Sequence, residues 1–187
     1  MEYVEPIKDI SKINEIKEIL KKQSPRDYAL FTLGINTGLR ISEILSIKLS
    51  DISDSSGSIN EFFSYTENEK AYCHFYLNKQ VHEALHLYLS SRDLKPGDYL
   101  FKSAKGDFPL SRQQAYRIIH QAAREAGITN KIGTHTLRKT FGYHAYQKGV
   151  AISLLQKILN HTSKKKTYEY LGIDPEQQAP LKIDVNL

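Results

Sequence analysis

The sequence is poor in several features that would each indicate a particular class of protein. It has a single cysteine, Cys73, in 187 residues, so it can form neither an internal disulfide nor a metal site built from several thiolates. Zinc fingers and secreted disulfide scaffolds are thereby excluded. Ten glycines and six prolines are too few for a low-complexity chain.

Long apolar runs are also missing. The longest, such as residues 28–35, fall far short of the length that spans a bilayer, and residues 1–9 contain no apolar core of a signal peptide. We therefore expect a protein that has no membrane partner and stays in the cytoplasm.

What remains is the composition of an ordinary globular chain. Hydrophobic residues make up 40% and charged residues 25%. At 187 residues, one domain can bury most of its apolar surface in a single core, and two large domains are not expected.

The positive charge is unevenly distributed along the chain. The formal net charge is +5, but residues 111–170 hold eleven basic and two acidic residues, a net of +9, whereas residues 1–110 and 171–187 each carry −2. Such clustering is typical of a surface that follows a phosphate backbone, where neutralised phosphates release counterions. Helices with lysine-rich outer faces are the alternative explanation.

Apolar spacing, capping residues and glycine stops predict a mainly helical chain. A strand pair over 59–65 and 71–77, around a polar turn at 67–70, predicts one hairpin. We therefore predict a mainly α fold with a small antiparallel β-sheet (α+β). The predicted helices begin at Ser11, Ser24, Ile41, Asn78, Ser111, Thr136, Ser153 and Ser163, with Gly38, Gly127, Gly149 and Gly172 as stops.

Three groups of residues could carry chemistry. Arg40 follows a predicted glycine stop, and His135 and Arg138 share one face at a helix start. His161 is followed nine residues later by Tyr170. Each group alone is more typical of a structural role: an arginine that satisfies helix carbonyls, a capping histidine, or a packed tyrosine.

Together the three groups supply two guanidinium groups, two imidazoles and a phenol within a basic domain. Two arginines can clamp the oxygens of a phosphate and stabilise the charge that develops there in a transition state. A tyrosine hydroxyl can attack phosphorus and store the bond energy in a covalent intermediate.

The motifs that contain these groups resemble a known family. The segments TGLRISE at 37–43, HTLRKTF at 135–141 and LLQKILNHTSKKKTYEYLG at 154–172 are similar to the three motif blocks of the tyrosine recombinases, the phage-integrase family. Their order, spacing and helical context match, and the resemblance covers most of the chain.

The resemblance implies a role for each of these residues. Arg40 and Arg138 would hold the scissile phosphate, His135 would assist proton transfer and His161 would hydrogen-bond the phosphate. Tyr170 would attack to give a 3′-phosphotyrosyl link and a free 5′-hydroxyl, and the strand would be rejoined to a new partner. The implied partners are double-stranded DNA and further copies of the chain, as a dimer or tetramer, and no metal or nucleotide cofactor is implied.

Other residues take supporting or alternative roles. Glu43, at the family's acidic position, would hold its neighbours in place. Tyr168 is the rival nucleophile, but two positions along a helix rotate a side chain by about 200°, so Tyr168 and Tyr170 cannot face one phosphate together. Within the basic segment we expect the DNA-contacting residues to be Arg112, Arg117, Lys139, Lys164, Lys165 and Lys166.

The sequence departs from the family pattern in two places. The family's catalytic lysine, which protonates the leaving 5′-oxygen from the hairpin turn, would align with Tyr65, and Lys70 is the lysine that the turn itself offers. Two neighbouring glutamates favour its protonated form. Asn160 replaces the usual glycine before His161, which asks a non-glycine residue to adopt a strained backbone. A weakened or inactive DNA-binding module is therefore the alternative hypothesis.

The sequence also predicts where the domain ends. Residues 1–173 would form the catalytic domain, and 174–187 a tail that either docks on a neighbouring protomer or frays. The family's N-terminal arm or core-binding domain has no counterpart here, as in a fragment or a short protein. A helical transcription regulator would explain the basic charge but would leave the order Arg, His, Arg, His, Tyr as a coincidence.

Overall fold

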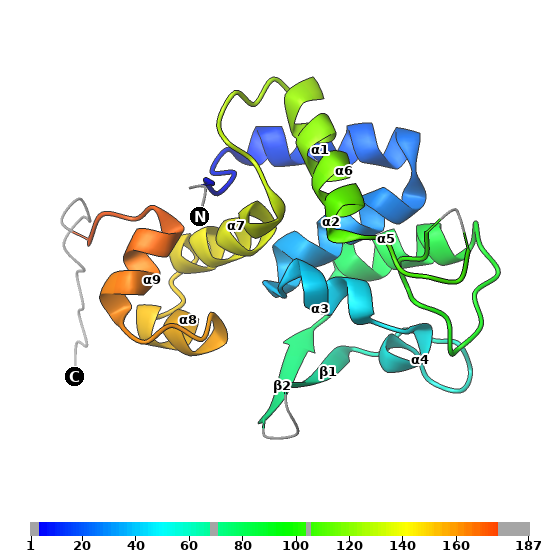
Figure 1. Ribbon diagram of the computed structural model, residues 1–187. Helices are drawn as coiled ribbons and strands as arrows, with labels where there is room; N and C mark the ends of the chain where they lie inside the picture. The colour runs from blue at the N-terminus through cyan, green and yellow to red at the C-terminus, as the bar shows by residue number, and fades with distance from the viewer. Residues whose placement is uncertain (1–3, 68–70, 104–105, 176–187) are drawn as a thin grey trace, which may run out of the picture.

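The computed structural model describes residues 4–67, 71–103 and 106–175. In this part of the chain helices pack around one antiparallel two-stranded sheet, which confirms the predicted fold class (Figure 1). The elements are α1 (Ile10–Gln23), α2 (Pro25–Thr37), α3 (Ile41–Ser46), α4 (Leu49–Ile52), β1 (Phe62–Glu67), β2 (Ala71–Tyr76), α5 (Lys79–Leu89), α6 (Arg112–Glu125), α7 (Thr134–Gln147), α8 (Ile152–Ile158) and α9 (Lys164–Leu171).

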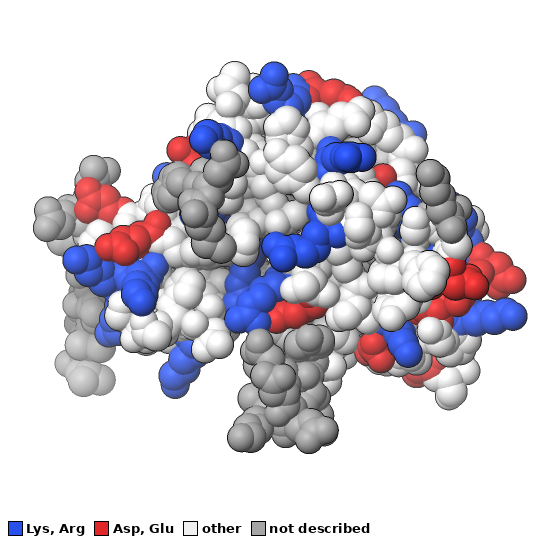
Figure 2. Space-filling view, in the orientation of Figure 1, with Lys and Arg blue, Asp and Glu red and all other residues white. Residues whose placement is uncertain are grey.

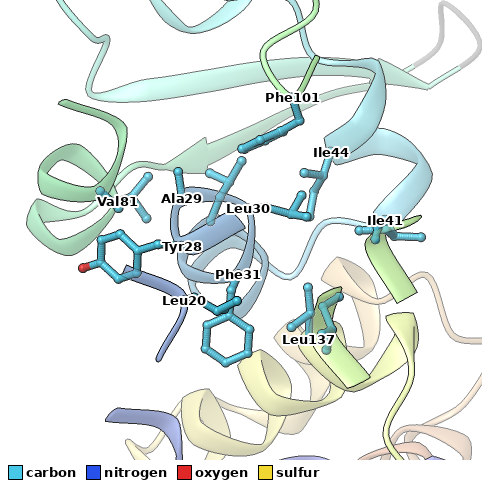
Figure 3. Close-up of a cluster of buried hydrophobic side chains, with 14 of the residues drawn as sticks. Leu20, Tyr28, Ala29, Leu30, Phe31, Ile41, Ile44, Val81, Phe101 and Leu137 are labelled. Atoms are coloured by element: carbon cyan, nitrogen blue, oxygen red, sulfur yellow. The ribbon is translucent and has the colours of Figure 1, made fainter. Parts of the chain in front are cut away.

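Helix α2 is the centre of the main core. Its residues from Tyr28 to Gly34 are all buried, as expected for a helix that is apolar on every side. Figure 3 shows its Leu30 and Phe31 between side chains from other helices, among them Ile44 of α3 and Leu137 of α7. Because α2 packs against α1, α5 and α7, its C-terminal end has a fixed place beside α3 and α7.

Most of the expected helix ends are where the sequence places them. Gly38 and Gly172 adopt left-handed conformations at the ends of α2 and α9. The side chains of Asn78, Ser111 and Ser163 cap α5, α6 and α9. These caps satisfy backbone N–H groups that have no partner within the helix.

Some helix starts differ from the prediction. Helix α1 is capped by Asp9, whose carboxylate accepts hydrogen bonds from both the backbone and the hydroxyl of Ser11, so the helix begins before Ser11. Helix α8 begins after Ala151 with no side-chain cap, and the Gln156 amide donates to the carbonyl oxygen of His161 instead of closing a capping box.

The hairpin forms as predicted, with the first strand shifted toward the turn. Strands β1 and β2 pair from Phe62 opposite Tyr76 to Glu67 opposite Ala71. Phe63 enters the main core and anchors the hairpin. The expected catalytic lysine, Lys70, lies outside the described residues.

Helices α8 and α9 form a small lobe on α7 with a core of its own. This second core consists of Leu155, Leu159 and Leu171, with Tyr170 packed against it. The lobe approaches α7 closely at Gly142, where a Cβ would come within 2.5 Å of the Leu171 side chain. Tyr170 therefore belongs to a unit that is packed separately from the main core.

Most of the predicted tail, residues 176–187, lies outside the described part of the chain. Among the described residues, no helix combines the length and the apolar composition needed to cross a bilayer.

Gly38 is the position where the fold depends most on glycine. Its φ is +69°, and a Cβ there would lie 2.3 Å from the Phe141 ring. We expect Gly38→Ala to lose about 1–2 kcal/mol of folding free energy through the left-handed backbone and about 1–3 kcal/mol through overpacking.

Gly57 is the matched control, because its φ is +82° and nothing lies within 4 Å of the point that a Cβ would occupy. Gly57→Ala should therefore lose only the backbone contribution. Urea denaturation of both variants measures the difference, and equal losses would contradict the packing described for Gly38.

Candidate active site

The site begins where α2 ends. The left-handed turn at Gly38 redirects the chain so that Arg40 becomes the residue that precedes α3. Glu43 lies one turn into α3 and accepts the backbone N–H of Arg40 through Oε2. The motif thus places an arginine and a carboxylate side by side at a fixed helix start.

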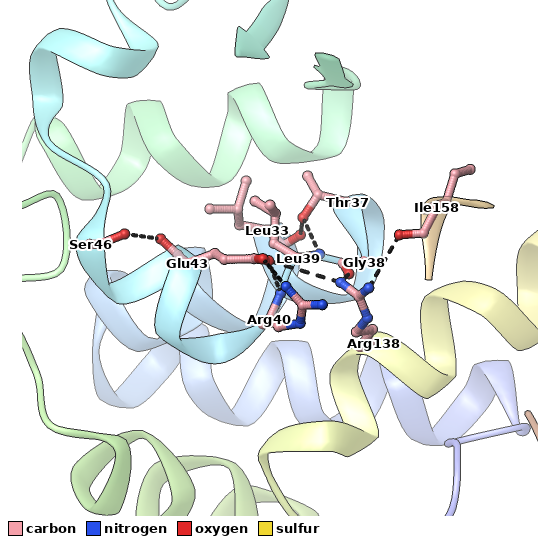
Figure 4. Close-up of polar contacts among 9 residues, drawn as sticks. All are labelled: Leu33, Thr37, Gly38, Leu39, Arg40, Glu43, Ser46, Arg138 and Ile158. Atoms are coloured by element: carbon pink, nitrogen blue, oxygen red, sulfur yellow. Dashed lines mark hydrogen bonds and ion pairs between the residues drawn. The ribbon is translucent and has the colours of Figure 1, made fainter. Parts of the chain in front are cut away.

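Glu43 pairs with both arginines of the site. Its Oε1 accepts a hydrogen bond of 2.9 Å from Nη1 of Arg40, and its Oε2 lies 3.9 Å from Nη1 of Arg138. The Glu43 residue is only 8% exposed. One buried carboxylate therefore lies between two guanidinium groups that would otherwise repel each other (Figure 4).

Arg138 reaches this point from the first turns of α7. It is 7% exposed, and its Nη1 donates to the carbonyl oxygen of Gly38 at 2.6 Å. Its Nη2 donates to the carbonyl oxygen of Ile158, at the end of α8, at 3.2 Å. A single guanidinium group thus joins the end of α2 to the small lobe.

The two histidines both lie within electrostatic reach of Arg138. The pKa of His135 is lowered by burial and then by the positive charges of Arg112, Lys139 and Arg138. The pKa of His161 is lowered by burial and then by Arg138 and Lys166. The neutral form of both imidazoles is therefore favoured at pH 7.

Tyr170 faces the same point from α9. Its ring packs edge-on against that of His161, with 4.8 Å between the ring centroids. Burial raises the pKa of Tyr170, and the charges of Arg138 and Arg40 oppose this shift. The phenol is therefore neutral at rest, with both arginines within electrostatic reach.

Tyr168 points elsewhere. Its ring packs at a right angle against Tyr146, with centroids 5.9 Å apart. A hydrogen bond with Tyr146, with burial as a smaller cause, raises the pKa of Tyr168. The two tyrosines do not share a face of α9, as their spacing predicts.

Lys139 occupies a place that differs from the one expected. The sequence groups it with the DNA-contacting residues, but it is 5% exposed and its Nζ donates to the carbonyl oxygen of Val4 at 2.8 Å. The ammonium lies 4.9 Å from the centroid of the Tyr170 ring. Burial lowers the pKa of Lys139, against a smaller opposing effect of Glu5. Lys139 therefore contacts the Tyr170 ring from inside the protein, through a cation–π interaction.

The segment before α1 contacts the helices that carry the site. The backbone N–H of Ile7 donates to the hydroxyl of Thr140 on α7, and Nζ of Lys8 donates to the carbonyl oxygen of Gly172 at the end of α9. Residues from the start of the described chain thus contact α7 and the end of α9, the helix that carries Tyr170. The sequence offers no local signal for these contacts.

The other basic residues expected to contact DNA are exposed. In Figure 2, lysines and arginines gather on the middle of this face, above the hairpin and across to the small lobe. The exposed residues of the expected set are Arg112, Arg117, Lys164, Lys165 and Lys166.

Asn160 shows the backbone that its position in the motif predicts. Its φ is +52°, which among the described residues makes it the single non-glycine with a positive φ. The turn directs the chain from α8 into His161. Within the described ranges, no three or more His, Cys, Asp or Glu side chains are grouped so that they could hold a metal ion.

Comparison with known proteins now identifies the family. The family model described as "Phage integrase family" matches residues 7–177. The chain belongs to the phage integrase family. The resemblance inferred from the three motifs is thereby confirmed, and the arrangement of Arg40, Arg138 and Tyr170 lies within the matched region.

Individual relatives support the same family assignment. The chain is 41% identical over 176 residues to a probable integrase/recombinase of Bacillus subtilis, covering 94% of this chain and 93% of the relative. It is 29% identical to a tyrosine recombinase of Pseudothermotoga lettingae, covering 88% of this chain and 56% of that protein. The crystal structure of XerA recombinase matches with a TM-score of 0.74 and 25% identity, covering 94% of this chain and 61% of XerA. The chain thus spans less than two thirds of these last two proteins.

The paired arginines give a prediction about Glu43. We expect Glu43→Gln to lower the free energy of unfolding by about 1–3 kcal/mol, because the two guanidinium groups lose their shared counter-charge. Glu83→Gln is the matched control, since Glu83 and Lys79 form an exposed pair at 3.8 Å whose loss should cost less than about 1 kcal/mol. Chemical denaturation at neutral pH compares them, and an equal effect would show that Glu43 does not hold the site together.

Proposed function

We propose that this protein breaks and rejoins DNA strands in site-specific recombination, with Tyr170 as the nucleophile. The observation that carries the proposal is the convergence of charged and titratable groups on one point. Glu43 pairs with both Arg40 and Arg138, and the Tyr170 ring packs against that of His161. Burial is the largest cause of the pKa shifts of His135, His161 and Tyr170, and the charge of Arg138 acts on all three. This grouping of side chains from α3, α7, α9 and the turn before α9 supports a phosphate site.

The chemistry follows from the properties of these groups. The phosphodiester would bind between Arg40 and Arg138, whose guanidinium groups stabilise the negative charge that builds on its oxygens. Oη of Tyr170 attacks phosphorus as the bond from phosphorus to O5′ breaks. The products are a 3′-phosphotyrosyl link and a 5′-hydroxyl, and attack by another 5′-hydroxyl reverses the step and rejoins the strand.

Two proton movements accompany the first step. The phenol of Tyr170 must lose its proton, and neutral His135 is suited to assist that transfer. The departing 5′-oxygen must gain a proton, which we assign to Lys70 of the hairpin turn. No metal or nucleotide takes part in this scheme.

DNA binding is proposed to use the exposed basic residues of α6 and α9. They are Arg112, Arg117, Lys164, Lys165 and Lys166, which would contact phosphates on either side of the cleaved bond. We further propose a cytoplasmic protein with a catalytic domain over 1–173, self-association on DNA and docking of 174–187 on a neighbouring protomer. An inactive DNA-binding module is the second candidate, favoured by the replacement of the usual turn lysine by Tyr65.

The nucleophile is tested with a nicked suicide DNA duplex. The wild-type chain should form a covalent protein–DNA adduct that is visible on a denaturing gel, and Tyr170→Phe should abolish it because the attacking oxygen is absent. Tyr168→Phe is the matched control and should keep the adduct. An adduct that survives Tyr170→Phe would refute the assignment, and DNA binding with no adduct from the wild type would favour the inactive module.

The DNA surface is tested through salt dependence. Lys165→Gln should weaken binding to all sequences alike and reduce the slope of log K against log salt by about 1, as expected for one lost phosphate contact. Lys22→Gln, at an exposed lysine at the end of α1 and outside the basic segment, should leave the slope unchanged. Fluorescence anisotropy over a salt series measures both, and equal slopes for the two variants would place the DNA elsewhere.

A further inference from the structure

The side chain of Thr167 connects His161 to the backbone of Ser163, the residue that caps the start of α9. The Thr167 hydroxyl oxygen lies 3.1 Å from Nδ1 of His161 and 3.1 Å from the carbonyl oxygen of Ser163. The residue has no solvent exposure, so water does not compete for these contacts. The same hydroxyl thus lies within hydrogen-bond distance of two groups.

A carbonyl oxygen can only accept, and a hydroxyl has one hydrogen to donate. Both contacts are therefore hydrogen bonds at the same time in one arrangement only. In that arrangement Thr167 donates to Ser163 and accepts from Nδ1–H of His161. Neutral His161 then carries its hydrogen on Nδ1 and a lone pair on Nε2.

We propose that Thr167 is a positioning residue that holds His161 as the Nδ1–H tautomer, so that Nε2 can bond to the scissile phosphate only after His161 takes up a proton. The proposal rests on the proposed function, in which a phosphate enters this site. Phosphate oxygens accept hydrogen bonds, and the lone pair of Nε2 would repel them. As an imidazolium, His161 donates to Thr167 and to the phosphate together.

The surroundings of His161 explain why protonation would accompany docking of the phosphate. Burial, Arg138 of α7 and Lys166 of α9 lower the pKa of His161 in the DNA-free protein, and Tyr170 of α9 faces it as a neutral phenol. A bound phosphodiester brings a negative charge that raises this pKa again. His161 therefore takes up a proton on binding at pH values between its pKa in the DNA-free protein and its pKa in the complex. Affinity for the phosphate rises as pH falls through that range.

The tautomer can be measured without DNA. Long-range proton–nitrogen correlation spectra of the ¹⁵N-labelled chain, recorded above the pKa of His161, distinguish a protonated from an unprotonated ring nitrogen. We expect Nδ1 to be protonated in the wild type and in Thr167→Ser, which keeps the hydroxyl. In Thr167→Val, which keeps the shape and loses the acceptor, the hydrogen should move to Nε2 in a large share of molecules.

A wild-type spectrum with the hydrogen on Nε2 would overturn the proposal. So would a Thr167→Val spectrum that matches the wild type. Because this measurement needs no DNA, it decides the tautomer whether or not the chain proves to be a recombinase.

The coupling to DNA is measured in Tyr170→Phe, where no cleavage follows binding. Calorimetric titration with the suicide duplex, in buffers of different ionisation enthalpy near neutral pH, gives the number of protons taken up. We expect a net uptake of protons when Tyr170→Phe binds the duplex. Adding His161→Gln or Thr167→Val should reduce this uptake toward zero, whereas adding Thr167→Ser should preserve it. Binding without proton uptake would overturn the proposal, whereas a lack of DNA binding would count against the proposed function instead.

Discussion

The structure of the site depends on the buried Arg138 guanidinium group and the carboxylate beside it. Arg138 donates to Gly38 at the end of α2 and to Ile158 at the end of α8, and Glu43 lies within ion-pair distance. These contacts join three parts of the chain that are remote in sequence. The side chain that would bind phosphate therefore also determines where α3 and the small lobe stand relative to each other.

These contacts of Arg138 also affect Tyr170, the proposed nucleophile. Tyr170 is packed on the small core of α8 and α9, not on the main core. Its place relative to Arg40 depends on Arg138, on the close approach at Gly142 and on Lys139 over its ring. A change in any of these contacts would move the Tyr170 hydroxyl relative to Arg40 without unfolding the main core.

Much of the fold and the site could be predicted from local patterns. The Gly38 stop correctly predicts the place of Arg40, and the spacing of Tyr168 and Tyr170 on one helix correctly predicts that they face different ways. Such features depend on residues within a few positions of each other, where helix geometry and capping rules apply.

The remaining features depend on contacts between residues far apart in the sequence. Lys139 has the sequence context of a surface lysine, because nothing local reveals that Val4, 135 positions away, accepts its ammonium hydrogen. The tethering of Arg138 to Gly38 spans 100 positions. Thr167 carries no signal in the sequence, because its importance comes from a bond to His161 that only the folded turn creates.

The central claim is that Tyr170 and the two arginines act on one phosphate. It is tested most directly by digesting the covalent protein–DNA adduct and identifying the nucleotide-linked peptide by mass spectrometry. The account predicts a 3′-phosphate joined to Tyr170. A link to Tyr168 or to any other residue would contradict it.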